Sequence, residues 1–320
     1  MKQKVRCGKP WLAAAAVGLA ADLCSAAASA AAEPDPALRA QLAWQIALER
    51  SGFSGGILDG KVGPKGRLAT REFQRARGLP VTGTLDERTA AALGVDPASA
   101  LAPYTVQAAD LAQVGPLPSE WAEKSKLPRL AYPSLDEALA EKFHCTRALL
   151  ARLNPGRDLA KLSPGETIQA PAIAAAPPAA RAEGLDVNLS EKVIRALGKE
   201  GETIALFHCS IAADKEKLPS GQASVLVISE NPVYTFDPKM WPEVKGVSQK
   251  LEIPPGPRNP VGLCWIGLSL PGYGIHGSPA PELIGKTGSH GCFRLTNWDA
   301  LRLARMVRVG TPVSFSTGPR

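Results

Sequence analysis

An alanine- and proline-rich run, residues 173–184, divides the chain into two parts that differ in the spacing of their apolar residues. Before this run, apolar residues recur at helical spacing, as in the segment 41–48. After it, short apolar runs alternate with Gly/Pro turns, which is typical of strands; examples are residues 203–207, 223–228 and 263–268. A run of this composition is typical of a linker. The chain has 320 residues, so we expect a multidomain protein whose C-terminal domain, residues 185–320, is mainly β with one or two helices.

Residues 1–32 have the pattern of a secretory signal peptide. A basic segment precedes a short apolar core, and two small-x-small sites, 28–30 and 30–32, precede Glu33. The alternative is a membrane anchor, against which the short core and Asp22 argue. We therefore expect a periplasmic mature protein. No later stretch reaches about 18 uninterrupted apolar residues, so no stable membrane span is expected.

Charge and cysteine content exclude several classes of protein. The 37 basic and 30 acidic residues give a net charge of +7, and no basic run is interleaved with aromatics, so no nucleic-acid partner is expected. Four of the six cysteines lie after the signal peptide, and no C-x-x-C occurs, so no metal or other cofactor is expected. Pairing of Cys209 with Cys264 stays open, whereas Cys292 is expected to be unpaired.

Residues 33–100 are predicted to form a small all-α unit. Helices are expected near 41–48, at about 65–77, and from a cap at Asp86 to Ala92, with Gly94 as the stop. The order of four short motifs in this unit resembles the peptidoglycan-binding domain of cell-wall enzymes; they are Asp59-Gly60, Phe73-Gln74, Gly78-Leu79 and Gly83. The alternative is a generic three-helix domain.

Residues 132–172 are predicted to form a second compact α+β unit, after a linker or irregular segment at 101–131. Ser134 and Glu137 have the spacing of a capping box, and Thr146 is placed to cap a second helix. Residues 154–156, Asn-Pro-Gly, end that helix, and a strand is expected within 165–171. The order of helix, helix and strand resembles a LysM-like glycan-binding module.

The C-terminal domain carries the residues suited to covalent catalysis. A His-Gly pair at 276–277 is followed twelve residues later by Ser-His-Gly-Cys at 289–292. Cysteine catalysis needs a base and oxyanion donors, which His276 and the backbone N–H groups around Gly291 and Cys292 can supply. A buried structural cysteine with two structural histidines, or a metal cluster, are the alternatives. A helix follows, for which we expect Asn297 as the cap and Gly310 as the stop.

This signature resembles the L,D-transpeptidase catalytic domain of the YkuD type. Segments around it support the resemblance; they are residues 254–262, 265–268, 273–277, 284–285 and 295–299. The resemblance implies that Cys292 is the nucleophile and that His276 is the base, oriented by the carbonyl of Gly277. It further implies that Ser289, His290 and Gly291 shape the loop and that Arg294 and Tyr273 contact substrate. Phe293 replaces a smaller aliphatic residue and is expected to narrow the pocket.

The resemblance implies acyl transfer in peptidoglycan. Cys292 would form a thioester on a tetrapeptide stem and release D-Ala, and a neighbouring stem's amine would then give a 3–3 cross-link. The implied partners are stem peptides and glycan strands. Two alternatives stay open: the same chemistry in a carboxypeptidase, an endopeptidase or an enzyme that attaches or releases a wall-linked protein, and a wall-binding scaffold without activity.

Overall fold

The computed structural model describes residues 35–173, 180–240, 244–289 and 291–318. The predicted signal peptide, residues 1–32, lies outside the described residues, as do half of the predicted linker (174–179) and His290. Within the described ranges, no helix combines the length and the apolar character needed to cross a membrane. Residues 33–320 form one compact unit in the clustering of backbone contacts.

The first part of this unit is helical, as predicted. Its helices are α1 (Pro36–Ser51), α2 (Pro64–Ala76) and α3 (Glu87–Leu93). The Asp35 side chain accepts a hydrogen bond from the Ala37 N–H, and Gly52 ends α1 in the left-handed conformation. Asp86 is the N-cap of α3 and Gly94 is its C-cap, as the sequence predicted. Local capping chemistry therefore determines where these helices begin and end.

The middle part differs from its prediction at two points. Its elements are β1 (Leu101–Thr105), α4 (Ala108–Leu111), α5 (Trp121–Lys124), α6 (Leu135–Lys142), α7 (Arg147–Leu153) and β2 (Thr167–Pro171). The range 101–131, expected to be linker or irregular, supplies β1, which pairs antiparallel with β2. Thr146 caps α7 as predicted. Ser134 occupies the N-cap of α6, but its side chain makes no cap hydrogen bond to any described residue, so the predicted capping box is wrong.

An eight-stranded sheet dominates the described part of the C-terminal domain. Its order is β11-β10-β9-β6-β12-β3-β4-β5. The strands are β3 (Gly184–Asn188), β4 (Val193–Leu197), β5 (Thr203–His208), β6 (Gln222–Glu230), β9 (Cys264–Leu268), β10 (Gly274–His276), β11 (Phe293–Arg294) and β12 (Pro312–Ser316). The pairs β10–β11 and β12–β3 are parallel, and the other neighbours are antiparallel. A separate hairpin joins β7 (Tyr234–Phe236) to β8 (Leu251–Ile253). Three short 3₁₀ helices complete the domain, namely η1 (Lys215–Lys217), η2 (Pro238–Met240) and η3 (Pro281–Leu283).

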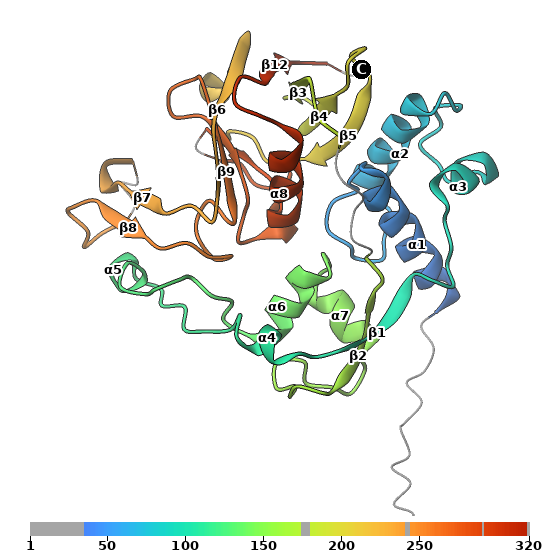
Figure 1. Cartoon of the computed structure of the whole chain (residues 1–320), viewed down its shortest axis with the longest axis horizontal. Coiled ribbons are helices and arrows are strands. Elements are labelled where there is room, and N and C mark those ends of the chain that lie inside the picture. The colour runs from blue at the N-terminus through green and yellow to red at the C-terminus, as the bar shows by residue number, and fades with distance from the viewer. Residues whose placement is uncertain (1–34, 174–179, 241–243, 290, 319–320) are drawn as a thin grey trace, which may run out of the picture. The chain divides into compact units, whose positions relative to one another are not determined.

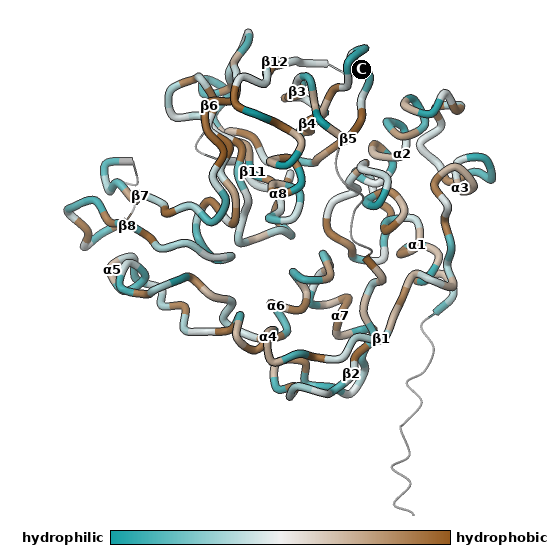
Figure 2. Tube along the Cα trace, in the orientation of Figure 1, coloured by the Kyte–Doolittle hydropathy of each residue, from teal (hydrophilic) through white to brown (hydrophobic). Residues whose placement is uncertain are grey.

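Helix α8 (Asn297–Met306) packs against the sheet and closes the main core (Figure 1). Ala300 and Leu303 of this helix are fully buried in a cluster with residues of β6 and β9, where hydrophobic residues concentrate (Figure 2). The predicted cap is wrong by one residue, because the Thr296 hydroxyl accepts from the Asp299 N–H and Asn297 begins the helix. The predicted stop is also wrong, because Val307 rather than Gly310 is the C-cap.

The helical part and the sheet share a second hydrophobic core. Trp44 and Phe73 of α1 and α2 pack in one cluster with Val193 and Leu206 of the sheet. The shared core fixes the helical part directly against the outer strands of the sheet.

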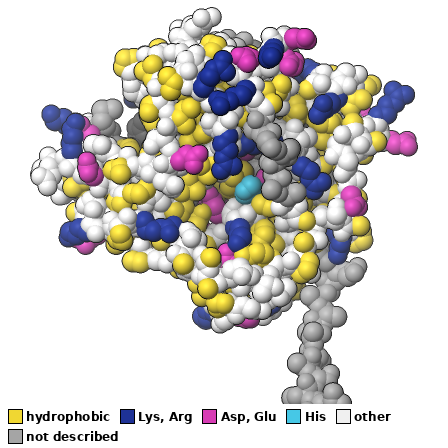
Figure 3. All heavy atoms as spheres, viewed as in Figure 1, with side chains coloured by type: hydrophobic (Ala, Val, Ile, Leu, Met, Phe, Trp, Pro, Cys, Tyr) yellow, Lys and Arg dark blue, Asp and Glu magenta, His cyan; other side chains and the backbone are white. Residues whose placement is uncertain are grey.

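Basic and acidic side chains are interspersed with uncharged ones over the face seen in Figure 3.

Candidate active site

The register at one edge of the sheet brings the predicted nucleophile and base to one face. In the parallel pair β10–β11, Ile275 lies opposite Phe293, and His276 lies opposite Arg294. Ile275 and Phe293 are both fully buried in the core. Because side chains alternate along a strand, His276 and Arg294 point to the other face. Cys292 precedes β11 by one residue and follows the same alternation, so its thiol joins them.

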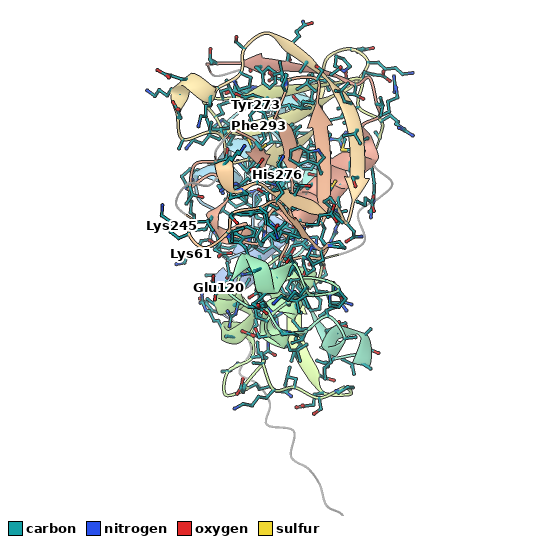
Figure 4. The ribbon with its side chains drawn as sticks, turned by 90° about the vertical axis from the view of Figure 1, so that its left-hand side faces the viewer. Lys61, Glu120, Lys245, Tyr273, His276 and Phe293 are labelled. Carbon is teal, nitrogen blue, oxygen red and sulfur yellow. The ribbon has the colours of Figure 1, made fainter. Side chains whose placement is uncertain are left out.

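A cavity of about 260 Å³ lies on that face. Cys292, His276 and Arg294 line it, together with Ser289 and Gly291 from the predicted loop. Its remaining walls come from Tyr234, Pro260, Val261, Trp265 and Gly272. Figure 4 shows His276 within the sheet domain, with Phe293 and Tyr273 labelled above it. The cavity therefore brings together predicted site residues from two segments of the chain, β10 and residues 289–294.

His276 is held as a neutral base. It is 5% exposed, and its Nδ1–H donates to the carbonyl oxygen of Gly277 at 2.7 Å. A carbonyl can only accept, so the proton resides on Nδ1 and the lone pair on Nε2. Burial, and to a smaller extent the nearby Arg294 guanidinium, lower the pKa of His276 to about 4 against the opposing effect of the Gly277 carbonyl. Trp265, opposite on β9, stacks on the imidazole with ring centroids 5.6 Å apart.

Cys292 is held as a neutral thiol. Burial raises its pKa, and the Gly274 backbone and the Arg294 guanidinium oppose that rise. The thiol donates to the Gly272 carbonyl oxygen at 3.5 Å. A protonated thiol beside a neutral imidazole favours proton transfer during nucleophilic attack over a preformed ion pair.

The loop before Cys292 is closed by Ser289. Its hydroxyl donates to the Cys292 carbonyl oxygen at 2.5 Å and accepts from the Gly291 N–H at 3.2 Å. The Ser289 N–H donates to the Ile211 carbonyl at 2.8 Å, which ties the loop to a neighbouring segment. The Gly291 N–H, predicted as an oxyanion donor, is therefore already engaged and has to exchange this bond before it can act.

The remaining predicted site residues differ in their placement. Arg294 lines the cavity and donates from Nη1 to the Gly288 carbonyl at 3.3 Å. The Tyr273 hydroxyl donates to the Lys217 carbonyl at 2.7 Å, and its ring lies beside Gly291 rather than among the lining residues. Phe293 was expected to narrow the pocket; this is wrong, because it points into the core and stacks on Phe315. The role of His290, outside the described residues, stays a prediction.

The other described cysteines are free and buried. They are Cys145, Cys209 and Cys264. Cys209 and Cys264 do not form the disulfide that the sequence left open. Burial raises the pKa of each of these three thiols to about 12, so they stay protonated at neutral pH. Cys292 is unpaired, as predicted.

Three cavity residues were missed by sequence reasoning for a physical reason. Tyr234 belongs to the hairpin and lies well before the signature in sequence, whereas Pro260 and Val261 lie in the loop after the hairpin, within the segment 254–262. Their place at the cavity depends on long-range packing that no local pattern encodes. Trp265 could have been found, because strand pairing of its segment with β10 sets it opposite His276.

Comparisons with known proteins match two segments of the chain. Residues 182–314 match the model of the L,D-transpeptidase catalytic domain, and residues 42–93 match the model described as "Putative peptidoglycan binding domain". "Putative L,D-transpeptidase YkuD" of Bacillus licheniformis is 28% identical over 180 residues, 56% of this chain and 92% of that protein. "Probable L,D-transpeptidase ErfK/SrfK" of Escherichia coli is 30% identical over 193 residues, 57% of this chain but only 62% of that protein.

Among solved structures, the chain is similar to the L,D-transpeptidase (residues 123–326) from Xylanimonas cellulosilytica, at 16% identity and a TM-score of 0.35, covering 86% of this chain and 92% of that one. The C-terminal part of the chain, residues 182–314, therefore matches an L,D-transpeptidase catalytic domain. The helical part before it includes a peptidoglycan-binding domain. These matches support two of the three resemblances drawn from the sequence, and the LysM-like module stays a prediction.

Proposed function

We propose that this protein forms 3–3 cross-links in peptidoglycan through a thioester on Cys292. The observation that carries the proposal is the position of Cys292 and His276 on one face of the sheet, lining one cavity, with the Gly277 carbonyl directing the imidazole. The two matched segments support it, because one matches the L,D-transpeptidase catalytic domain and the other matches a putative peptidoglycan-binding domain.

In the first half-reaction, the Cys292 sulfur attacks the carbonyl carbon that joins the L-centre of a stem residue to D-Ala. The thiol proton passes to Nε2 of His276, and a tetrahedral oxyanion forms. When the C–N bond breaks, His276 returns this proton to the leaving amine, and D-Ala departs. Backbone N–H groups of the 289–292 loop stabilise the oxyanion, which requires Gly291 to release its bond to Ser289.

In the second half-reaction, a side-chain amine of a neighbouring stem attacks the thioester. The amine loses a proton to His276, the C–S bond breaks, and the proton restores the Cys292 thiol. Water in place of the amine would give a tripeptide, and a protein amine would give a wall-linked protein. The covalent intermediate implies ping-pong kinetics.

Substrate contacts follow from the lining of the cavity. Arg294 presents a guanidinium on the same face as Cys292, where it can bind a stem carboxylate. Trp265 and Tyr234 offer aromatic surface to the stem backbone and side chains. Tyr273, with its hydroxyl bound to Lys217, supports the loop beside Gly291 and acts on substrate through that loop.

The remaining modules fit a role in the cell wall. The peptidoglycan-binding domain and a LysM-like module at residues 132–172 would hold the enzyme on glycan strands. Export by the signal peptide at residues 1–32 would deliver the mature chain to the periplasm, where peptidoglycan lies. Reduced binding to isolated sacculi after substitutions on the exposed surface of the 132–172 module would support the LysM-like assignment.

Mass spectrometry of products from purified disaccharide-tetrapeptide tests the proposal. We expect the wild type to yield a dimer that lacks one D-Ala, and Cys292→Ala to yield none. A tripeptide as sole product would assign water as the acceptor. Unchanged substrate with the folded wild type would instead favour the non-catalytic scaffold and overturn the proposal.

A further inference from the structure

A buried amide lies directly behind the predicted base. Asn297, the first residue of α8, is 1% exposed, and its Oδ1 accepts from the Leu263 N–H at 3.0 Å. A Cβ atom built on Gly277 would lie 2.3 Å from this oxygen, so the amide is packed against the Gly277 backbone. Because the Gly277 carbonyl orients the imidazole, the Asn297 amide packs against the residue that holds His276.

The other end of that amide binds a residue of the middle module. Asn297 Nδ2 donates to Glu141 Oε1 at 2.8 Å and makes a longer contact of 3.4 Å to the Pro257 carbonyl. Glu141 lies on α6, 156 residues earlier in the chain. With Oδ1 already committed to Leu263, the amide has one stable orientation, and Glu141 supplies the stronger of its two acceptors.

A second contact docks the same face of α6. Glu137 lies one turn before Glu141 and forms an ion pair with Arg258 at 2.9 Å. Arg258 in turn donates from Nη1 to the Pro279 carbonyl at 2.6 Å. The two glutamates of α6 therefore contact the catalytic domain on both sides of the segment that follows His276.

We propose that Glu141 is a positioning residue for the catalytic histidine, acting through Asn297 and the Gly277 backbone. The inference rests on the proposed function, since it assigns the support of the same base. Without the carboxylate, Nδ2 keeps only the long contact to Pro257, and the amide gains freedom to turn. A displacement of about 1 Å at a reacting group can cost about 10²-fold in rate.

The support is geometric and does not require a charge on Glu141. Burial raises the pKa of Glu141 to about 7; Asn297, His144 and Arg258 oppose the rise, and Glu137 adds to it. Either protonation state leaves a carboxyl oxygen that accepts from Asn297. A glutamine at this position also keeps such an oxygen, which makes it the conservative variant.

Steady-state kinetics of the full-length protein on disaccharide-tetrapeptide test the assignment. We expect Glu141→Ala to lower kcat about 10- to 100-fold, the usual range for residues that orient a catalytic group, with KM changed less than about twofold. Glu141→Gln should keep kcat within about twofold of the wild type. The matched control is Asp136→Ala on the same helix, which removes an ion pair to Arg147 within the module and should leave kcat unchanged.

A donor–acceptor exchange separates positioning from stability. Assayed above the pKa of Glu141, which is about 7, Asn297→Asp should lose kcat, because two carboxylates then face each other. Adding Glu141→Gln should restore kcat, because the glutamine amide then donates to one oxygen of the new carboxylate at position 297. The other oxygen of that carboxylate still accepts from the Leu263 N–H. A purely structural role would move the melting temperature and leave kcat of the folded protein unchanged.

Wild-type kcat in Glu141→Ala would overturn the inference, as would failure of the double variant to recover activity despite a native melting temperature. Should Glu141→Ala fail to fold, the exchange at 141 and 297 decides the matter. A wild type without any acyl transfer would instead reject the proposed function, so the two failures are distinguishable.

Discussion

For the individual residues, the proposed mechanism requires that Cys292 and His276 are both neutral before the reaction. The thiol proton then moves to the imidazole only during nucleophilic attack. Two contacts on the histidine support this state: the Gly277 carbonyl fixes the tautomer, and burial keeps the imidazole uncharged. His276→Ala should slow acylation of Cys292 about 10²–10⁴-fold, the range for loss of a general base. Stopped-flow acylation measures this change. A loss below about threefold would assign the base to another residue, with His290 the next to test.

The protonation state of His276 also determines how the rate of Cys292 acylation depends on pH. A base whose pKa is lowered stays neutral at pH values where an ordinary histidine, with a pKa of about 6.5, is protonated. Burial lowers the pKa of His276 to about 4, so acylation should rise with pH through about 4 and stay near its maximum at pH 5. A pH profile of kcat/KM checks this limb. A midpoint near 6.5 would show that the imidazole is hydrated in solution.

Capping rules located both ends of α3 and the start of α7, and they failed at the start of α8, where two capping residues are adjacent. Asp86 and Thr146 cap their helices as expected, because each is the only strong cap at its position. Thr296 and Asn297 are adjacent. The Thr296 hydroxyl caps the helix, whereas the Asn297 side chain packs against the Gly277 backbone. The contact between Asn297 and Glu141 joins residues too distant in sequence for any local pattern to reveal it.

Among the secondary-structure elements, the hairpin β7–β8 forms one wall of the active site, and the short helix α5 packs against this hairpin. Trp121 of α5 stacks on Phe236 with ring centroids 4.3 Å apart, and Tyr234 of the same strand lines the cavity. Leu130 donates its N–H to the Pro255 carbonyl beyond β8 at 2.8 Å. The segment 121–130 therefore sets where this wall lies.

Trp121→Ala should loosen the wall while leaving the nucleophile and base in place. We expect KM for the tetrapeptide substrate to rise about threefold to tenfold, the equivalent of about 1 kcal/mol for a lost aromatic pair, with kcat little changed. Lys124→Ala is the control, because it removes the cation above the Trp121 ring and keeps the stack. An unchanged KM in Trp121→Ala would show that the hairpin positions itself.

The element scale is also where sequence reasoning reached its limit. The runs at 203–207, 223–228 and 263–268 became β5, β6 and β9, since each carries apolar residues between turns. The strand β1 escaped notice because it contains Pro103 and finds its partner, β2, more than 60 residues later. Strand order and register follow from such distant pairings, which single-sequence patterns do not specify.

At the scale of the whole molecule, the helical domain is a structural part of the catalytic unit. Arg195 of β4 is fully buried and pairs with Glu72 of α2, which is 1% exposed, at 3.1 Å. Phe53, after α1, bridges to Leu206 of β5. Deletion of the N-terminal modules would expose this shared surface, so point substitutions test their role better than truncation.

Glu72→Ala should destabilise the protein strongly. Removing one partner of a buried ion pair costs about 3–5 kcal/mol when the remaining charge has no other partner. Asp186 and Glu191 also pair with Arg195, so the loss should lie near the lower figure. Urea unfolding measures the free energy. Arg75→Ala is the matched control, since it removes the exposed partner of the same carboxylate and should cost less than about 1 kcal/mol. Equal losses in the two variants would contradict the special weight given to the buried pair.

The central claim, a covalent acyl-enzyme at Cys292, has one direct measurement. The resemblance to L,D-transpeptidases implies that a carbapenem acylates this cysteine and stays bound to it. Intact-mass spectrometry of the folded protein after incubation should show one added drug mass on the wild type and none on Cys292→Ala. An adduct that persists in Cys292→Ala would contradict the account, as would a wild type that remains unmodified.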